Sequence, residues 1–268
     1  MKPFHLNQLL LATTLILCFY GCTWKTPANL QASQGSAIVG IVTPDALYLF
    51  TDSARSTIGP LQGATSELAD LGAQKAWKIR RVIFAQAGLR SMKVNNEEYD
   101  FTEPARRLLE TSDVFDPAQF FPVWNSEIKR AVNDAFVNNP ADFRQLVQNG
   151  VKGVELVLGW FDSMSSPQLV RHHIAIEISE GGNLVLKDTD SEVQPGEAGR
   201  GSVLLGAEAA DIAPELKADR KTYSTLDELM GKGLYPAAAN LIITYAAKRS
   251  REVGGAIQTV TLLKRELR

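Results

Sequence analysis

Cysteine is scarce in this sequence, and the little that occurs lies at one end. The 268 residues contain two cysteines, Cys18 and Cys22, so neither a disulfide framework nor a cysteine-rich zinc site can be built. Only three histidines occur, His5, His172 and His173, which leaves little for a histidine-based metal centre. His172 and His173 are adjacent in an expected strand, where neighbours point to opposite faces and cannot easily share one ion. We therefore expect no metal and no cofactor, and we interpret this pair as structural or surface histidines.

An excess of charge of one sign is also lacking. The sequence has 28 basic and 30 acidic residues, a formal net charge of −2, and no basic block. A nucleic-acid partner is therefore not expected. With 45% hydrophobic and 22% charged residues, the composition is typical of a globular protein and excludes a disordered chain, a coiled coil and a collagen-like rod. The length suits one domain or two small ones.

The apolar run at the N-terminus is too short for a comfortable membrane-spanning helix. Lys2 precedes this run, which covers about residues 9–20, and the combination fits a secretory signal peptide. Gly21-Cys22 follows and is similar to a bacterial lipoprotein cleavage site, at which the cysteine would carry lipid. We predict a signal peptide at 1–22 and a protein that is exported, either periplasmic or membrane-anchored through lipid on Cys22. The alternatives are cleavage nearby, for example after Ala28, and a retained anchor.

Residues 23–35 are polar, contain Pro, Ser, Gln and Gly, and show no periodicity. This composition predicts a linker or propeptide ahead of a folded domain at 36–268. No second linker and no internal repeat occur, so we expect one folded domain.

Apolar, β-branched runs mark the expected strands. Residues 36–42 and 46–51, separated by the turn signal Pro44-Asp45, predict a hairpin, and 76–79 with 82–87 predict another. Residues 56–74 are expected to be a loop with a short helix at 66–71. Further strands are predicted at 154–160, 169–178, 183–187, 199–206 and 254–263. The predicted core residues are Val39, Ile41, Leu47, Leu49, Leu156 and Leu158.

Helices are predicted between the two blocks of strands. Capping residues at 102–104 precede one helix, and Asp116-Pro117 begins a second over 117–137 with apolar residues every three or four positions. A further turn or two is expected at 141–148, and helical segments at 207–218 and 225–249. Blocks of strands and helices in this order suggest two sheets covered by helices rather than alternating βαβ units.

Several short motifs occur in an informative order. They are Gly35 to Ile41 (GSAIVGI), Asp52 to Arg55 (DSAR), Lys75 to Ile79 (KAWKI), Ala85 to Gly88 (AQAG), Leu158 to Asp162 (LGWFD), Lys248-Arg249 and Gly254-Gly255. Together they resemble the proteasome β-subunit family of N-terminal nucleophile hydrolases over about residues 36–265, with an insertion at 56–74. The resemblance implies an α+β fold, a four-layer αββα sandwich.

The resemblance also implies a set of site residues. Ser36 would be the nucleophile, Lys75 would lie near its hydroxyl, Asp52 would hold Lys75, and Gly88 would offer its N–H to the developing oxyanion. If the chain is cut after Gly35, the freed α-amine, with a pKa of roughly 8, can act as the base. The alternatives are a serine that begins a strand, a strand-capping aspartate, a surface lysine and a glycine that turns the chain.

Three positions depart from the family pattern. The usual Gly-Ser-Gly reads Gly206-Ala207-Glu208, and the positions of a supporting aspartate and serine read Ser250 and Val253. In the family these absent groups orient the α-amine and the nucleophile. Their replacement bears on self-cleavage and turnover rather than on the fold, and Ser250 or Glu208 could compensate.

Two functions follow from these observations. The first is an exported amidohydrolase of the N-terminal nucleophile type that acts on peptide bonds or small amides. The second is a non-catalytic, proteasome-like domain that binds or assembles. A homo-oligomer is kept as an alternative to a monomer, because the sequence contains no interface motif that would decide between them.

Overall fold

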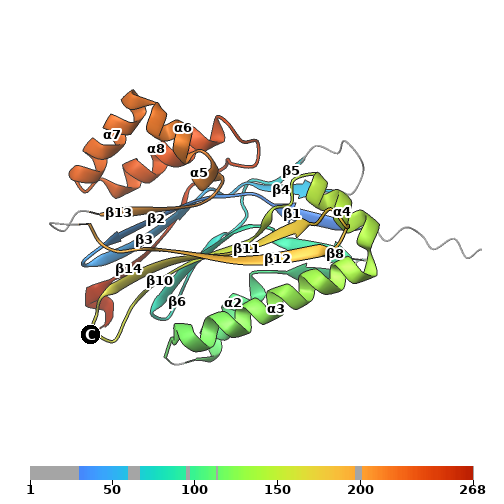
Figure 1. Cartoon of the computed structure of the whole chain (residues 1–268). Helices are drawn as coiled ribbons and strands as arrows, with labels where there is room; N and C mark the ends of the chain where they lie inside the picture. Colours follow the sequence, from blue (N-terminus) through green and yellow to red (C-terminus); the bar gives the residue numbers. More distant parts are fainter. Residues whose placement is uncertain (1–29, 60–66, 95–96, 113, 197–200, 268) are drawn as a thin grey trace, which may run out of the picture.

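Antiparallel sheets with helices on their outer faces form the structure (Figure 1). The computed structural model describes residues 30–267, except for 60–66, 95–96, 113 and 197–200. The predicted signal peptide at 1–22, with Cys22, and the first part of the expected linker lie outside the described residues. Within the described ranges, no helix is both long enough and apolar enough to cross a membrane.

The first sheet contains the predicted N-terminal hairpin at its centre. Its strands run in the order β13-β2-β3-β14, and each neighbouring pair is antiparallel. The bounds are Ala37–Thr43 for β2, Ala46–Thr51 for β3, Ser202–Ala207 for β13 and Gln258–Leu263 for β14. The predicted core residues Val39, Ile41, Leu47 and Leu49 are all fully buried here.

The second sheet has the order β12-β11-β10-β7-β6 and is also antiparallel throughout. The strands are β6 (Ala76–Ile79), β7 (Val82–Gly88), β10 (Gly153–Phe161), β11 (Pro167–Ile178) and β12 (Leu184–Val193). Leu156 and Leu158 of β10 are fully buried, as predicted. All five strands were expected, although β12 extends well beyond the predicted 183–187.

A third sheet differs from the sequence-based expectation. Its order is β5-β4-β1-β8-β9, with β1 (Gln31–Gln34), β4 (Arg55–Ile58), β5 (Glu67–Asp70), β8 (Ser91–Val94) and β9 (Glu97–Asp100). The helix predicted at 66–71 is therefore wrong, because β5 pairs with β4 instead. Residues 31–34, expected to be linker, form a central strand of this sheet. These strands have four residues each, too few to reveal an apolar alternation.

Helices α2 (Glu103–Thr111), α3 (Pro117–Asn138) and α4 (Pro140–Gln148) lie on one side of the molecule (Figure 1). The predicted start of α3 is confirmed, because the carboxylate of Asp116 accepts a hydrogen bond from the Ala118 N–H at 2.9 Å. Phe120, Trp124, Ile128 and Val132 are buried along one face of α3, whereas Val123, placed on the same face by its spacing, is 44% exposed.

On the opposite side lie α5 (Glu208–Asp211), α6 (Ala213–Ala218), α7 (Arg220–Gly231) and α8 (Tyr235–Ala247). The helical segment expected at 225–249 is thus two helices. Gly233 has a φ of +70° just after α7, and Pro236 stands in the first turn of α8, so the chain stops one helix and begins another.

Three apolar clusters hold these elements together. One joins α2, α3 and α4 to the sheet that contains β10, and another joins the C-terminal helices to the sheet that contains β2. The third lies between the two sheets, with Ile38 and Leu49 facing Ala85 and Val157. One end of this inter-sheet layer is polar and contains the predicted site residues.

Candidate active site

Ser36 lies in the short connection between β1 and β2. It is buried, with 1% of its surface exposed, and its Oγ has no hydrogen-bond partner among the residues that the structure describes. Its carbonyl oxygen accepts a hydrogen bond from the Glu208 N–H at 3.1 Å, which fixes the backbone on one side. Because a buried hydroxyl without a partner is costly, Ser36 is the kind of residue that invites a functional explanation.

Asp52 follows β3 directly and is the polar centre of the site. Its Oδ1 accepts the Ala37 N–H at 2.8 Å, and its Oδ2 accepts the N–H groups of Ala54 at 3.1 Å and Gly254 at 3.0 Å. The side chain is fully buried. It therefore ties the residue after Ser36 to the loop before β14.

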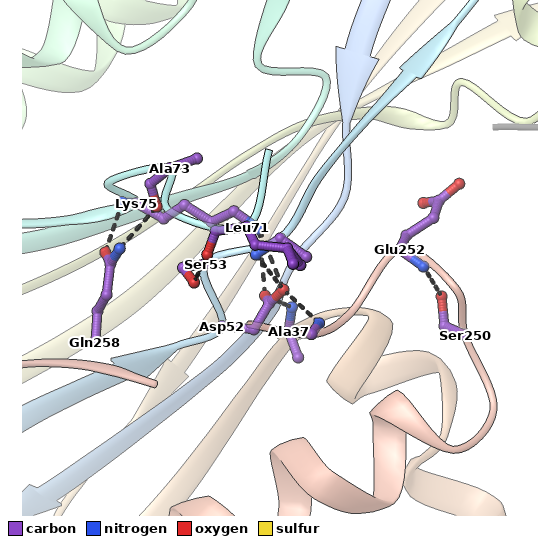
Figure 2. A network of polar contacts seen from close by, with 11 residues as sticks. Ala37, Asp52, Ser53, Leu71, Ala73, Lys75, Ser250, Glu252 and Gln258 are labelled. Carbon is purple, nitrogen blue, oxygen red and sulfur yellow. Dashed lines mark hydrogen bonds and ion pairs between the residues drawn. The ribbon is translucent and has the colours of Figure 1, made fainter. Parts of the chain in front are cut away.

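Lys75 is the cation that faces this carboxylate (Figure 2). Its Nζ lies 3.3 Å from each oxygen of Asp52, and its side chain is fully buried. Burial lowers the pKa of Lys75 from 10.5 to about 8, although the negative charge of Asp52 opposes this decrease. The ammonium is thus held by the carboxylate that also accepts the N–H of Ala37, the residue after Ser36.

Gln258, which the sequence analysis missed, holds the backbone of Lys75. Its side-chain oxygen accepts the Lys75 N–H at 2.8 Å, and its amide nitrogen donates to the Ala73 carbonyl at 2.7 Å (Figure 2). A glutamine at the start of a strand gives no distinctive signal, because its role depends on a segment more than 180 positions earlier.

Gly88 ends β7 and lines the same cavity as Ser36. Its φ of +69° lies in the region that favours glycine, and a Cβ there would be 2.3 Å from the Gly153 carbonyl oxygen. No other residue type fits this position without a shift of the backbone. The structure thus brings Ser36 and Gly88 to one cavity and joins Asp52 to Lys75 next to it.

The cavity beside Ser36 has a volume of about 70 Å³. Its walls are largely glycine backbone and charged side chains, most of which the sequence analysis did not single out. The lining residues are Gln34, Gly35, Ser36, Gly88, Gly150, Lys152, Gly153, Glu155, Arg171, His173, Ala207, Glu208, Asp211 and Glu252. A cavity of this size has room for a few waters or for the end of one side chain.

Glu155 is the most deeply buried charged group of this lining, with 2% of its surface exposed. Its Oε2 forms an ion pair with Arg171 at 2.6 Å, while its Oε1 lies against Gly206 and has no side-chain donor among the described residues; the Ala207 backbone also hydrogen-bonds to the carboxylate. Burial raises the pKa of Glu155, and Arg171 opposes this rise. A lone glutamate within the apolar run of β10 was the available signal in the sequence.

Of the three positions that depart from the pattern of the resembled family, Ala207 lines this cavity, and Ser250 and Val253 are close in sequence to the lining residue Glu252. Ala207 lines it with a φ of +45°, a backbone conformation that non-glycine residues rarely adopt. The Ser250 Oγ accepts the Glu252 N–H at 3.2 Å, and Val253 is buried among apolar residues. Burial raises the pKa of Glu208, with Glu252 adding to the rise and Lys152 opposing it.

The two adjacent histidines point in opposite directions, as predicted for neighbours on a strand. His172 contacts Trp124 and Phe121 of α3 and hydrogen-bonds to Asp190 and, at 2.6 Å, to Asn125. His173 lines the cavity beside Ser36 instead. Among the residues that the structure describes, no group of three or more His, Cys, Asp or Glu side chains could hold a metal ion.

No protein-family model matches the sequence, and no curated protein matches it. Solved structures similar to the chain include Anbu (ancestral beta-subunit) from Yersinia bercovieri, with 12% identity and a TM-score of 0.44 over 85% of this chain and 81% of that one. An Anbu (Gly-1) mutant from Hyphomicrobium sp. strain MC1 has 11% identity and a TM-score of 0.34, over 85% of this chain and 82% of that one.

Proposed function

We propose that this protein is an amide hydrolase of the N-terminal nucleophile type, with Ser36 as the nucleophile after cleavage between Gly35 and Ser36. The fold assigned with it is the four-layer αββα sandwich of that superfamily. The observation that carries the proposal is the buried Lys75–Asp52 pair, which is hydrogen-bonded to the backbone directly after Ser36. A buried ion pair is weak evidence for stability alone, so a role for Lys75 in chemistry accounts better for its burial.

In the proposed reaction, the Ser36 Oγ attacks the carbonyl carbon of a peptide or small amide. The free α-amine of Ser36 takes the hydroxyl proton and passes it to the leaving amine as the carbon–nitrogen bond breaks. Water then cleaves the resulting ester, and the same amine serves as base. Lys75, mostly protonated at pH 7 with a pKa of about 8, stabilises negative charge on Oγ, and Gly88 provides an N–H for the oxyanion.

Processing is a precondition of this chemistry. In the uncut chain the nitrogen of Ser36 is an amide, which has no lone pair available for proton transfer. Glu208 and Ser250 stand at positions that depart from the pattern of the resembled family and hydrogen-bond to each other, and we assign them to the orientation of the freed amine. Export through residues 1–22 and lipid attachment at Cys22 complete the proposal, which makes small or unfolded extracytoplasmic peptides the expected substrates.

The test combines N-terminal sequencing, intact mass and a peptide-amide assay. We expect the wild-type chain to begin at Ser36 and to hydrolyse small peptide amides slowly, and Ser36→Ala to keep its upstream residues and be inactive. Lys75→Ala should lower activity by about 10²-fold. Lys78→Ala is the matched control, because Lys78 is an exposed lysine paired with Glu266. A wild-type chain that keeps Gly35 and is no more active than Ser36→Ala contradicts the proposal.

One observation favours a second candidate, a non-catalytic domain that binds or assembles. The strand β1 just before Ser36 lies between β4 and β8 and pairs with both. A chain that keeps this strand would keep Ser36 buried and blocked. Retention of Gly35 in the mature protein would select this candidate.

A further inference from the structure

We infer that the cavity beside Ser36 is a binding site for an organic cation, an ammonium or guanidinium group, with Glu155 as its buried acceptor. If the proposed function holds, this cationic group is the basic side chain of a peptide substrate. Three observations support it: the excess of carboxylates, the buried oxygens without a side-chain donor, and the size of the cavity.

The location of Glu155 within its strand is the first step. Side chains two positions apart on a strand share a face, so Glu155 points to the same side as Val157. Val157 packs in the apolar layer between the two sheets. Arg171 and His173 of β11 share that side, because they lie opposite Val157 and Glu155. The apolar layer therefore ends in a buried cluster of charged and polar side chains.

The charge of the lining is the second step. Four carboxylates, of Glu155, Glu208, Asp211 and Glu252, face two permanent cations, Lys152 and Arg171. Burial lowers the pKa of His173 from 6.5, so its ring is neutral at pH 7. The lining thus has a formal excess of two negative charges, which favours a cationic ligand.

The distribution of the ion pairs sharpens this conclusion. Arg171 pairs with Glu155, and Lys152 pairs with Asp211 at 2.6 Å. In the part of the chain that the structure describes, neither Glu208 nor Glu252 forms an ion pair. Glu252 accepts hydrogen bonds from the Gln34 side-chain amide at 3.1 and 3.3 Å, a neutral donor. These two carboxylates therefore have no ion-pair partner of their own and share the field of Lys152, which is already paired with Asp211.

Buried oxygens without a side-chain donor are the third step. Glu155 and Ser36 are lining side chains that are 2% and 1% exposed. Within the described residues, the Ser36 Oγ has no hydrogen-bond partner, and no side-chain donor reaches Glu155 Oε1, which lies against Gly206 while the Ala207 backbone hydrogen-bonds to the carboxylate. A buried acceptor left unsatisfied costs free energy that a donor can recover, and a charged donor recovers the most. Ammonium and guanidinium groups supply several N–H donors and no acceptor.

The shape of the cavity limits what can enter. Its volume of about 70 Å³ suits the end of a lysine or arginine side chain but not a ring system. Gly35, Gly88, Gly150 and Gly153 form much of the wall, so backbone rather than side chains bounds the space. A Cβ on Gly153 would come within 2.6 Å of His173 Nε2, so a larger residue there would disturb the wall.

The binding test uses the uncut Ser36→Ala protein, so that it does not depend on turnover. Ethylguanidinium and butylammonium are titrated by calorimetry, with uncharged N-ethylurea as the isosteric control. We expect both cations to bind and the urea not to bind. Glu155→Gln should weaken cation binding by about tenfold or more, because it removes the charge and keeps the shape. Glu177→Gln, an exposed glutamate on β11 paired with Lys187, should bind as Ser36→Ala does.

Glu252→Gln keeps the test decisive if Glu155→Gln does not fold. It removes one unpaired charge and leaves the buried pair intact, and we expect a two- to fivefold loss, about that of a partly exposed charge. Thermal unfolding of each variant reports folding separately. Failure of both cations to bind folded Ser36→Ala overturns the inference whether or not the wild-type protein is an enzyme.

The substrate arm uses peptide amides that carry arginine or its uncharged isostere citrulline beside the cleaved bond. We expect the cleaved wild-type enzyme to prefer arginine by about tenfold in kcat/KM and to lose this preference in Glu155→Gln. Cation binding with no turnover of any peptide would refute the proposed function alone. Two results together would overturn the substrate assignment in favour of a small free amine. The enzyme would turn over peptides without preferring arginine, and arginine peptides would fail to displace the bound free cations.

Discussion

Gly206 on β13 lies directly against Glu155 on β10. A Cβ at position 206 would be 2.2 Å from Glu155 Oε1, closer than any real contact allows. The buried carboxylate and the missing side chain therefore fit one another across the two sheets. The absence of a side chain at Gly206 thus has a structural reason in the position of Glu155.

The first prediction concerns this pair. Gly206→Ala should lower the free energy of unfolding by about 1–3 kcal/mol, the usual cost of overpacking. Adding Glu155→Ala removes the clashing group, so the double variant should lose less than the sum of the two single variants. Urea unfolding of the four proteins in a double-mutant cycle measures the coupling. Strict additivity would show that the two residues do not meet.

The second prediction concerns the pH dependence of stability. The folded chain releases the Lys75 proton near pH 8, whereas the unfolded chain holds it up to about pH 10.5. The unfolded state binds more protons in this window, so the free energy of unfolding rises with pH and the gain is lost as the pH falls through 8. Between pH 7 and 10, the wild-type protein should gain roughly 2–3 kcal/mol relative to Lys75→Met. Urea unfolding at each pH checks this, and parallel curves would contradict it.

The third prediction concerns the loss of the counter-charge. Asp52→Asn leaves the Lys75 ammonium buried without an anion, so it should lower the free energy of unfolding by about 3 kcal/mol or more. It should also lower the pKa of Lys75 further, because Asp52 raises that pKa. Asp45→Asn is the matched control in the exposed turn between β2 and β3, with an expected change within about 0.5 kcal/mol. Equal stabilities of the two variants would show that the buried pair is dispensable.

The fourth prediction concerns localisation. If residues 1–22 direct export and Cys22 carries lipid, fractionation of expressing bacteria should recover the protein outside the cytoplasm, in the membrane fraction. Cys22→Ala should abolish labelling by a fatty-acid analogue, whereas Cys18→Ala should not. Cytoplasmic protein that retains Met1 would contradict export.

Sequence patterns predicted the fold where burial leaves a periodic signal. The strands around Val39, Leu49 and Leu158 are apolar runs long enough to recognise, and α3 repeats its buried residues every three or four positions. The third sheet was missed because its strands have four residues each, so that buried residues such as Ala32, Ile58 and Met92 are too few per strand to form a recognisable apolar pattern. Strand β1 (Gln31–Gln34) was consequently expected to be linker ahead of the domain predicted at 36–268.

The candidate site also contains both residues that the sequence predicted and residues that the sequence analysis missed. Asp52 and Lys75 were predicted to pair, and the structure joins them. The roles of Ser36 and Gly88 in catalysis stay predictions. Glu155 and Gln258 were missed because their importance arises from residues far away in the sequence: Arg171 and Gly206 for the first, and the segment at 73–75 for the second.

Strand β1 would remain bound after the proposed processing step. Its backbone pairs with β4 and with β8, and Leu30 ahead of it is fully buried. Breaking the Gly35–Ser36 bond would leave all of these interactions in place, so the cleaved segment would stay bound non-covalently and would continue to cover Ser36. Hydrolysis of the chain and unblocking of the serine are then separate events, and the second is governed by the dissociation rate of a strand.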